Sequence, residues 1–484
     1  MRNPTITRAA AYAAAFTVIA FAPFTAQAQT TAPDDVAALR EQIRQLDQKL
    51  RVLERNLELK DETATAAAKA QPKLALGDGR FELTSADGAN SIRLRGLVQA
   101  DGRYYVDGTN ATTDTFLLRR ARLAFEGKFN NIFAYTVQTE FAGSAVSILD
   151  ANVVTAINPA FNVRVGRFKT PIGLEQLQSD PVAFFNERSV ATNLTPNRDV
   201  GVQLEGAFAT NTLSYQLGVF NGVPDAGNAQ QSTQDFDNQK TVAARLFATP
   251  FVNDKESVLK GLGFGLAASQ GYYDGTSARA SGYRTDGQQT FFSYESTVLA
   301  DGKGITISPQ AYYYYGPLGI LAEYVASSTD VRRSAALPVR EVENVGWNLS
   351  AGYVLTGEDA SYKGVTPKTV FNPSAGTWGA FEVVARIAAL DIDDTVFTAL
   401  PATTGTPAAK ATQLAARRLA NPDVSASGVT TYGLGLNWYP AKAVRVGLNY
   451  FVADYDLAPG AKPAKGAVIS ENEQAVVGRV QVSF

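Results

Sequence analysis

The 484-residue sequence contains no histidine and no cysteine, and it has a single methionine. The absence of histidine excludes a Ser-His-Asp triad, a Cys-His pair and a histidine-ligated metal site. The absence of cysteine means that no disulfide can hold the chain together. The sequence therefore predicts a protein that is not an enzyme, with no catalytic residues, no metal site and no cofactor.

Long apolar runs and excess charge are also absent. No run after residue 24 is long enough to span a membrane as a helix, which excludes a helical membrane protein. The 44 basic and 46 acidic residues leave a formal charge of −2, so bulk charge predicts no anionic partner, nucleic acid included, and any preference for anions must come from where the charges lie. What the chain has instead is glycine and aromatic residues, with 40 Gly, 20 Tyr and 26 Phe, which suits a chain made of strands and turns.

The N-terminus has the pattern of a secretory signal. Arg2 and Arg8 precede an apolar stretch from Ala9 to Phe24, and Ala26-Gln-Ala28 follows it. We therefore expect residues 1–28 to be a signal peptide that is removed on export. An exported chain of this size without disulfides can be stabilised by a closed, hydrogen-bonded barrel.

A heptad pattern follows the signal. Apolar residues recur at alternating steps of three and four, with charged residues and glutamine between them, at Val36, Leu39, Ile43, Leu46, Leu50, Leu53 and Leu57. This spacing predicts a coiled-coil helix that joins several copies of the chain, and a single amphipathic helix packed on the mouth of the barrel predicted below is the alternative. Residues 61–72, rich in Ala and Thr, read as a linker, so residues 29–72 are expected to be a periplasmic coiled coil and linker.

From about residue 80 to residue 484, short segments with alternating apolar and polar residues are separated by turn residues, which is the pattern of a transmembrane barrel. The last segment ends on Phe484, and bacterial outer-membrane barrels typically end on an aromatic residue. Sixteen strands are predicted, at 92–105, 116–128, 132–142, 148–157, 161–169, 200–210, 212–221, 240–249, 261–272, 305–315, 318–328, 345–356, 378–390, 430–439, 444–454 and 474–484.

An even number of strands places both ends of the barrel chain on the periplasmic side. For this reason we assign the strand-like segment Phe291–Val298 to a long external loop, while the long link 357–377 falls on the periplasmic side. The predicted fold class is an all-β transmembrane barrel of about sixteen antiparallel strands, in the bacterial outer membrane, preceded by a short periplasmic coiled-coil helix.

A barrel of this width is not filled by its wall side chains, so its lumen should hold water. The connection 170–199 contains three prolines, the pair Phe184-Phe185 and the basic residues Arg188 and Arg198. Such apolar content is unsuited to a loop in solvent. We therefore expect this segment to fold into the lumen as a constriction loop.

Alternation along the strands predicts which charges face the water, because a basic side chain facing lipid at mid-depth costs about 2–4 kcal/mol. The first two strands should direct Arg93, Arg95, Asp101, Arg103, Arg120, Arg122, Glu126 and Lys128 inward. Leu117 should face outward, and Arg119 should lie on the lipid side near a rim of the barrel. Later strands should direct Arg164, Arg245, Arg386, Arg445 and Arg479 inward. These arginines could contact anions or pair with wall carboxylates, Arg120 and Arg122 with Glu126, and Arg386 with Glu382.

Five segments of this chain resemble the phosphate-selective porin O and P family. They are Leu117-Leu-Arg-Arg-Ala-Arg-Leu-Ala-Phe-Glu-Gly127, Val165-Gly-Arg-Phe-Lys-Thr-Pro-Ile-Gly-Leu-Glu175, Phe185-Asn-Glu-Arg188, Tyr353-Val-Leu-Thr-Gly-Glu358 and Gly435-Leu-Asn-Trp-Tyr-Pro440. The resemblance covers the chain after residue 80. It implies a sixteen-stranded, trimeric outer-membrane porin whose third loop folds inward and whose lumen presents basic residues to passing anions.

The residues expected to contact the anion are Arg93, Arg95, Arg120, Arg122, Lys128, Arg164, Lys169, Arg188 and Arg198. Of these, the resemblance places basic contacts at Arg120, Arg122 and Lys169, and assigns Arg188 and Arg198 to the constriction loop. The expected partners are outer-membrane lipid, small anions such as phosphate or polyphosphate, and two further copies in a homotrimer. A general or differently selective porin and a structural barrel that tethers the envelope are the alternative functions.

Overall fold

The computed structural model describes residues 33–77, 80–106, 113–208, 210–223, 225, 237–279, 282–401, 407, 409, 413, 414, 416–470 and 472–484. The predicted signal peptide, residues 1–28, lies outside these residues. The chain divides into two compact units, Met1–Ala70 and Gln71–Phe484, each of which is described by itself.

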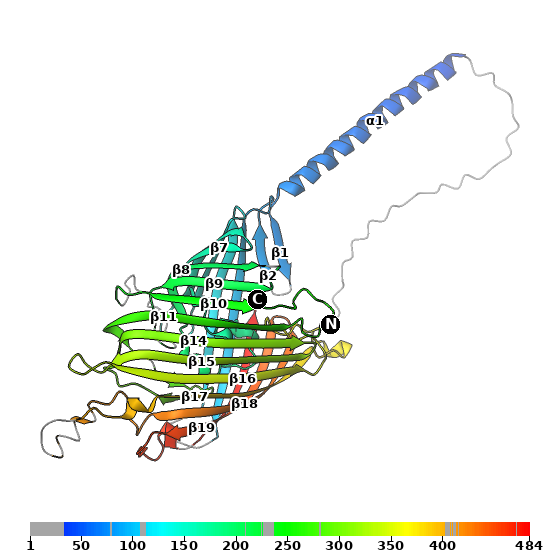
Figure 1. Cartoon of the computed structure of the whole chain (residues 1–484). Coiled ribbons are helices and arrows are strands. Elements are labelled where there is room, and N and C mark those ends of the chain that lie inside the picture. The colour runs from blue at the N-terminus through cyan, green and yellow to red at the C-terminus, as the bar shows by residue number, and fades with distance from the viewer. Residues whose placement is uncertain are drawn as a thin grey trace. The chain divides into compact units, whose positions relative to one another are not determined.

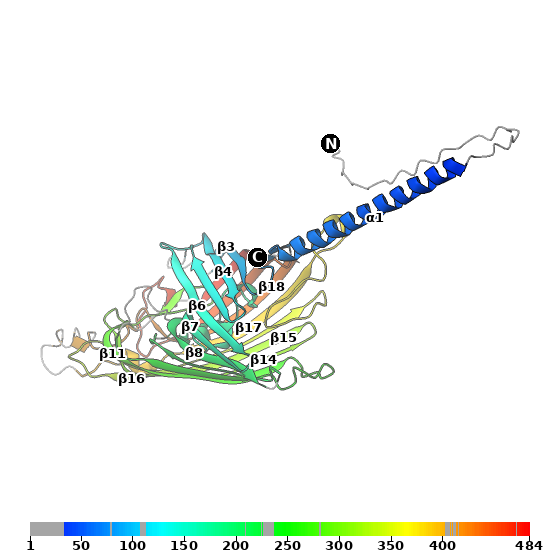
Figure 2. The ribbon, with the colours of Figure 1, turned by 90° about the horizontal axis from the view of Figure 1, so that it is seen from above.

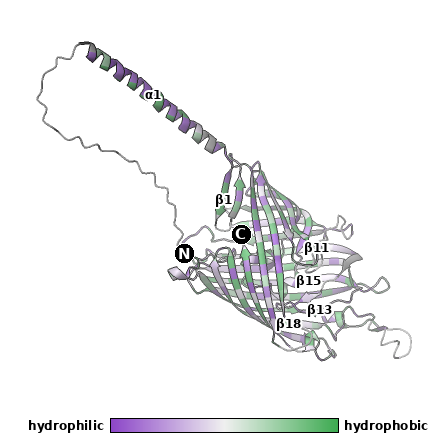
Figure 3. Cartoon of the chain, turned by 180° about the vertical axis from the view of Figure 1, so that it is seen from behind, coloured by the Kyte–Doolittle hydropathy of each residue, from purple (hydrophilic) through white to green (hydrophobic). Residues whose placement is uncertain are grey.

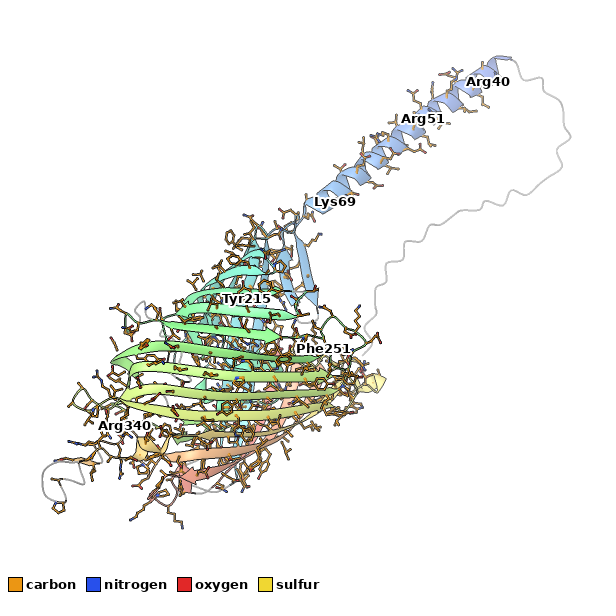
Figure 4. All side chains as sticks on the ribbon, in the orientation of Figure 1. Arg40, Arg51, Lys69, Tyr215, Phe251 and Arg340 are labelled. Carbon is orange, nitrogen blue, oxygen red and sulfur yellow. The ribbon has the colours of Figure 1, made fainter. Side chains whose placement is uncertain are left out.

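The first unit contains one long helix, α1 (Pro33–Ala70), along which Figure 4 labels the basic side chains Arg40, Arg51 and Lys69. The prediction that a linker begins at Asp61 is wrong, because the helix continues to Ala70. Alanine, which is frequent in this stretch, is the strongest helix former. The seven apolar heptad positions all lie on the helix surface, 43–63% exposed. Within the described part of the chain, no helix is long and apolar enough to cross a membrane.

The second unit is a closed antiparallel barrel (Figure 1). Its sixteen strands are β3 (Ser91–Tyr105), β4 (Thr115–Phe129), β5 (Phe133–Glu140), β6 (Ser147–Asn158), β7 (Phe161–Lys169), β8 (Arg198–Phe208), β9 (Leu213–Phe220), β10 (Thr241–Ala248), β11 (Leu262–Arg279), β14 (Leu299–Tyr315), β15 (Leu318–Arg332), β16 (Arg340–Val354), β17 (Ala380–Asp391), β18 (Ala426–Ala441), β19 (Val444–Leu457) and β20 (Glu473–Ser483). Each predicted strand overlaps one of these, so the predicted barrel of sixteen antiparallel strands with a helix before it is confirmed.

The barrel closes where β20 pairs with β3. The backbone amide of Gly96 donates to the carbonyl of Phe484 at 2.9 Å, and the amide of Phe484 donates back to the carbonyl of Gly96 at 3.1 Å. The ring of Phe484 covers Gly96 so closely that a Cβ there would lie 2.2 Å from Cζ of the ring. A short hairpin, β1 (Lys73–Gly77) and β2 (Arg80–Thr84), pairs with the start of β3 beyond this point.

Apolar and polar residues alternate along the strands, and Figure 3 shows this as bands of the two colours across the wall. Val137, Leu217 and Leu434 point outward and are 41%, 47% and 64% exposed. Polar residues of the other face, such as Gln203 and Asn437, are buried inside the barrel. The outer surface is therefore apolar, as a surface in contact with lipid must be.

Two of the tight links between strands use left-handed backbone at consecutive residues. Asn130 and Asn131 have φ of 51° and 56°, and Thr210 and Asn211 have φ of 57° and 68°. Asparagine adopts this conformation more readily than most residues. Such links reverse the chain within a few residues and fix the register of the strands on either side.

A second sheet of two strands, β12 (Tyr283–Arg284) and β13 (Thr290–Phe292), lies between β11 and β14 in the chain. It is not part of the barrel wall, in agreement with the prediction that left Phe291–Val298 out of the wall to keep the number of strands even. Its aromatic side chains, however, do not project into solvent, because Tyr283, Phe291 and Phe292 are buried. They belong to an apolar cluster with inward residues of β15, β16 and β17, among them Val325, Val342 and Leu390, so this hairpin fills part of the barrel interior.

Three short 3-10 helices lie in later links, at Pro373–Ala375 (η3), Asp394–Phe397 (η4) and Val468–Ser470 (η5). The long link 357–377 also turns toward the interior. The hydroxyl of Tyr362 donates to the carbonyl of Leu174 at 2.6 Å, and Nε2 of Gln178 donates to the carbonyl of Tyr362 at 2.9 Å. Residues 174 and 178 belong to the connection between β7 and β8, which is thereby supported by this link.

Candidate functional site

The connection between β7 and β8, residues 170–197, lies inside the barrel and is called the inner loop below. It contains α2 (Leu174–Leu177) and the 3-10 helices η1 (Asp180–Val182) and η2 (Val190–Leu194). Leu174, Phe184 and Phe185 form an apolar cluster with inward side chains of the wall, including Leu321 and Phe451. Burial of these aromatic and aliphatic groups holds the inner loop against the wall.

Polar contacts fix the same loop on strands β15, β17 and β19. The Glu323 carboxylate accepts the backbone amides of Leu174 and Glu175 at 2.7 and 3.1 Å. Nη2 of Arg386 donates to Oε1 of Glu175 at 2.6 Å. Nη2 of Arg445 donates to the carbonyl of Phe184 at 2.8 Å. Buried charged groups need hydrogen-bond partners, so each of these contacts favours the same placement of the inner loop against the wall.

A cavity of about 1030 Å³ remains between the tip of the inner loop and strands β3–β9. Figure 2 shows β3, β4 and β6 on the side of the barrel opposite β14. The basic side chains that line this cavity are Arg93, Arg95, Arg122, Arg164, Lys169, Arg198 and Lys442. The carboxylate side chains are Asp150, Asp180 and Glu205. Seven basic groups against three acidic groups give the cavity a positive potential.

Six of the nine predicted anion contacts lie on this cavity, and several are paired. Arg122 contacts Glu140 at 2.6 Å and also Asp180. Arg164 contacts Glu205 at 2.8 Å, and Arg198 contacts Asp150 at 3.1 Å. Arg95 pairs with Glu126, so the partner predicted for Arg120 and Arg122 is wrong.

Arg120, Arg188 and Lys128 lie outside the cavity lining, whereas Lys169 belongs to it. Arg120 donates to Oε1 of Gln99 at 2.8 Å, and Nη1 of Arg188 lies 2.7 Å from Oδ1 of Asp180. Lys169 donates from Nζ to two carbonyls of the inner loop, at 2.6 and 3.0 Å. Lys128 bonds Asn131 at 2.6 Å in the turn after β4. Arg188 and Lys169 therefore hold the loop in shape.

Arg93, Lys169 and Lys442 differ from the other basic groups on the cavity, since none of the three makes an ion pair within the described part of the chain. Lys169 instead donates to two carbonyls of the inner loop, which leaves Arg93 and Lys442 as the more open groups. In addition, the Nε groups of Arg93, Arg95, Arg103 and Arg120 are buried and meet no acceptor among the described residues. A buried donor without an acceptor is costly, which makes these guanidinium groups available to an anion.

Arg119 was predicted to face lipid, and this is wrong. The pairing of β3 with β4 shifts by one residue between Gln99 and Ala100, which face Arg120 and Leu118. Arg119 is the extra residue of this β-bulge, and its Nε donates to Oε1 of Glu187 inside the barrel at 2.7 Å. Leu117, also predicted to face lipid, pairs with the inward residue Asp101 and shares its face.

The predicted pair of Arg386 with Glu382 is also wrong. Arg386 contacts Glu175 at 2.6 Å and Asp286 at 3.2 Å, two carboxylates from segments folded into the lumen. Glu382 instead accepts from Nδ2 of Asn437 at 3.0 Å and from the hydroxyl of Tyr439 at 2.7 Å. Proximity along strand β17 did not decide the partner of Arg386, because the inner loop and the β12–β13 hairpin bring Glu175 and Asp286 within reach of its guanidinium group.

The acidic residues of the inner loop were missed at the sequence level. Asp180 and Glu187 are 7% and 3% exposed at their side chains and face several arginines of the wall. Burial alone would raise the pKa of both carboxyls. The guanidinium groups of Arg120, Arg188 and Arg122 around Asp180, and those of Arg119, Arg479 and Arg120 around Glu187, outweigh burial and hold each pKa well below its usual range.

Comparisons with known proteins agree with this architecture. The model of the family described as phosphate-selective porin O and P matches residues 92–484. The chain is 24% identical to Porin O of Pseudomonas aeruginosa over 412 residues, covering 78% of this chain and 86% of that protein. It is 28% identical over 193 residues to an uncharacterized protein of Caulobacter vibrioides, covering 33% of this chain and 38% of that protein.

Among solved structures, the outer membrane channel DcaP of Acinetobacter baumannii is similar in fold. The two share 11% sequence identity with a TM-score of 0.50, over 82% of this chain and 98% of that one. At this level of identity the likeness shows the barrel fold alone.

Proposed function

Because the chain belongs to the phosphate-selective porin O and P family, we propose that this outer-membrane porin passes small anions, phosphate or polyphosphate in particular. The observation that carries the proposal is the basic excess on one cavity, seven basic against three acidic side chains. Arg93 and Lys442, which have no ion-pair partner among the described residues, are the groups most available to a passing anion.

The proposed mechanism is electrostatic. A guanidinium group about 4 Å from a phosphate oxygen contributes about 4 kcal/mol at an intermediate effective dielectric, before the cost of removing water. Paired groups such as Arg164 and Arg198 contribute less, because a carboxylate already occupies part of their donors. Weakened sites of this kind let an anion enter and leave again, which conduction requires.

The helix α1 supports a further part of the proposal, that three copies join through their heptad positions. The exposed stripe that includes Leu39, Leu46 and Leu53 is stable in water only if another apolar surface covers it. Three such helices packed as a coiled coil would cover it. In the proposed topology this bundle lies in the periplasm and the barrels lie in the outer membrane as a homotrimer.

Single-channel recording tests the function. We would reconstitute the full chain in planar bilayers under a potassium chloride gradient and then titrate phosphate against chloride. Discrete current steps, an anion-selective reversal potential and saturation by phosphate are the expected results. Steps without selectivity or saturation would leave a general porin, and no steps from a folded oligomer would favour a structural barrel that tethers the envelope.

A further inference from the structure

Glu187 of the inner loop is surrounded by four guanidinium groups from three strands. Oε1 of Glu187 lies 2.7 Å from Nε of Arg119, 2.7 Å from Nη2 of Arg479 and 3.3 Å from Nη2 of Arg103. Oε2 lies 2.9 Å from Nη2 of Arg119 and 3.9 Å from Nη2 of Arg120. One carboxylate therefore occupies donors from β3, β4 and β20.

Asp180 continues the same cluster. Its carboxylate contacts Arg188 at 2.7 Å, Arg120 at 3.5 Å and also Arg122. Two wall carboxylates take part as well, Asp101 with Arg479 and Glu140 with Arg122. In total, the cluster holds six guanidinium groups, Arg103, Arg119, Arg120, Arg122, Arg188 and Arg479.

Four carboxylates do not neutralise six guanidinium groups, so the cluster keeps a positive charge. Two buried donors within it, Nε of Arg103 and Nε of Arg120, have no acceptor in the described part of the chain. A carboxylate and a small oxyanion present the same kind of oxygen acceptors to a guanidinium group. Glu187 therefore holds a position that a permeating oxyanion could also hold.

We propose that Glu187 determines the anion specificity of the lumen by competing with permeating oxyanions for Arg119, Arg120 and Arg479. This inference rests on the proposed function and deepens it. Two members of the cluster, Arg122 and Asp180, line the cavity, and Asp180 also contacts Arg120. An oxyanion that enters the cluster from the cavity meets guanidinium groups that Glu187 already occupies in part, so it passes rather than lodges. Without the negative charge, the same groups would bind small oxyanions more tightly. Glu187 acts through the arginines and is thus a positioning residue.

A purely mechanical role, in which Glu187 only tethers the loop, can be separated from this one. The neighbouring backbone keeps its own anchors, since the amide of Asn186 donates to Asn449 at 2.8 Å and Nδ2 of Asn186 donates to the carbonyl of Val477 at 3.1 Å. The carbonyl of Glu187 accepts from Nη1 of Arg386 at 3.0 Å. Removing only the charge of Glu187 should therefore leave the loop in place.

The test compares Glu187→Gln, which removes charge and keeps shape, with Glu187→Asp, which keeps charge. Glu205→Gln is the matched control, because Glu205 is a carboxylate on the cavity itself and pairs with a single arginine, Arg164. Each full-length variant is reconstituted in planar bilayers. The readouts are the reversal potential in a potassium chloride gradient and the phosphate concentration that half-saturates the current.

We expect Glu187→Gln to shift the reversal potential toward anions and to lower the half-saturating phosphate concentration about tenfold, as gain of one charge-assisted hydrogen bond would. Glu205→Gln should change the reversal potential and the half-saturating phosphate concentration less than Glu187→Gln does. Glu187→Asp should give values near those of the wild type. Equal shifts for Glu187→Gln and Glu205→Gln would overturn the inference. A Glu187→Gln channel with larger conductance and lost anion selectivity would also overturn the inference, because it would show that Glu187 only holds the inner loop in place.

Failure of the proposed function gives a different result. A wild-type channel that is not anion-selective and is not saturated by phosphate would refute the function. The inference about Glu187 concerns only the direction in which Glu187→Gln moves the reversal potential relative to the wild type and to Glu205→Gln. An absent shift in a wild-type channel that does prefer anions would refute the inference alone.

Discussion

Arg119 and Arg120 are adjacent in the chain, yet both contact carboxylates inside the barrel. In a regular strand, two neighbouring residues face opposite sides, so one of them would meet lipid. A one-residue bulge at Arg119 resolves this conflict by turning its side chain inward. Two consecutive basic residues within a membrane strand were the signal for the bulge, because neither is tolerated on the lipid side.

The double replacement Arg120→Ala with Arg122→Ala should turn the lumen toward cations. It leaves Asp180 and Glu140 with fewer positive neighbours. We expect the anion-to-cation permeability ratio to fall by roughly tenfold, the equivalent of about 1.4 kcal/mol. Reversal potentials in a potassium chloride gradient measure this permeability ratio. The matched control is Arg44→Ala with Arg51→Ala on α1, which loses the same charge outside the barrel unit. A ratio unchanged from this control would contradict the role of the two wall arginines.

The lowered pKa of Asp180 and Glu187 predicts how the inner loop responds to pH. In the unfolded chain both carboxyls titrate near pH 4, and in the folded chain the arginines hold each pKa lower. Their ion pairs therefore add stability above about pH 4, and this contribution is lost as pH falls through the lowered values.

We accordingly expect the thermal midpoint of the folded barrel to be similar at pH 7 and pH 5 and to drop only below about pH 4. Circular dichroism melts in detergent at each pH provide the measurement. The Asp180→Asn, Glu187→Gln double variant should lose part of this acid sensitivity. If it melts with the same pH profile as the wild type, other carboxyls control acid unfolding.

At the scale of elements, closure of the barrel depends on one strand pair. Gly96 leaves room for the ring of Phe484 where β20 meets β3, and a Cβ there would lie 2.2 Å from the ring. Gly96→Leu should push the ring away and weaken the seam by about 1–3 kcal/mol, as overpacking does. The barrel band on gels run without boiling should then convert to the unfolded position at a lower temperature. An unchanged conversion temperature would mean that the ring moves without cost.

The β12–β13 hairpin gives a second prediction at this scale. Phe292 is completely buried in the apolar cluster between the hairpin and the wall, and it stacks on Tyr283 with ring centroids 5.3 Å apart. Phe292→Ala should cost about 3–5 kcal/mol, because it leaves a cavity in a packed region. Urea unfolding followed by tryptophan fluorescence would measure this. Phe371→Ala, at a residue 36% exposed, is the control and should cost much less.

At the scale of the whole molecule, the heptad stripe of α1 needs partners. Leu46 and Leu53 are 63% and 62% exposed in one chain. Burying each in a coiled coil would contribute about 1.5–3 kcal/mol. Leu46→Glu with Leu53→Glu should therefore weaken the trimer, lowering the temperature at which it dissociates on mild detergent gels, while the barrel stays folded.

Light scattering after size exclusion would report the mass of the same variant. The control replaces two exposed polar residues of the same helix, Gln45→Glu and Gln48→Glu, which adds equal charge away from the heptad positions. Equal dissociation temperatures for the two variants would show that the barrels alone hold the oligomer together.

Period-two alternation, short turns and an even strand count were sufficient to predict the sixteen-stranded barrel and its inward arginines other than Arg119. These features are local, since a strand that crosses a membrane must direct its apolar face to lipid whatever its neighbours are. The heptad pattern predicted the helix α1 in the same way. It did not predict that the helix ends at Ala70, because alanine extends a helix without any periodic signal.

The tertiary structure alone decided which charges meet. Arg386 pairs with Glu175 and Asp286 rather than Glu382, and Glu187 gathers four arginines, because the inner loop and the β12–β13 hairpin occupy the lumen. Ion pairs between residues that are far apart in the chain depend on where inserted segments pack, and no pattern along one strand encodes that. The sequence determined that the wall is a barrel with basic groups inside, and packing within the lumen determined which of those groups remain open to an anion.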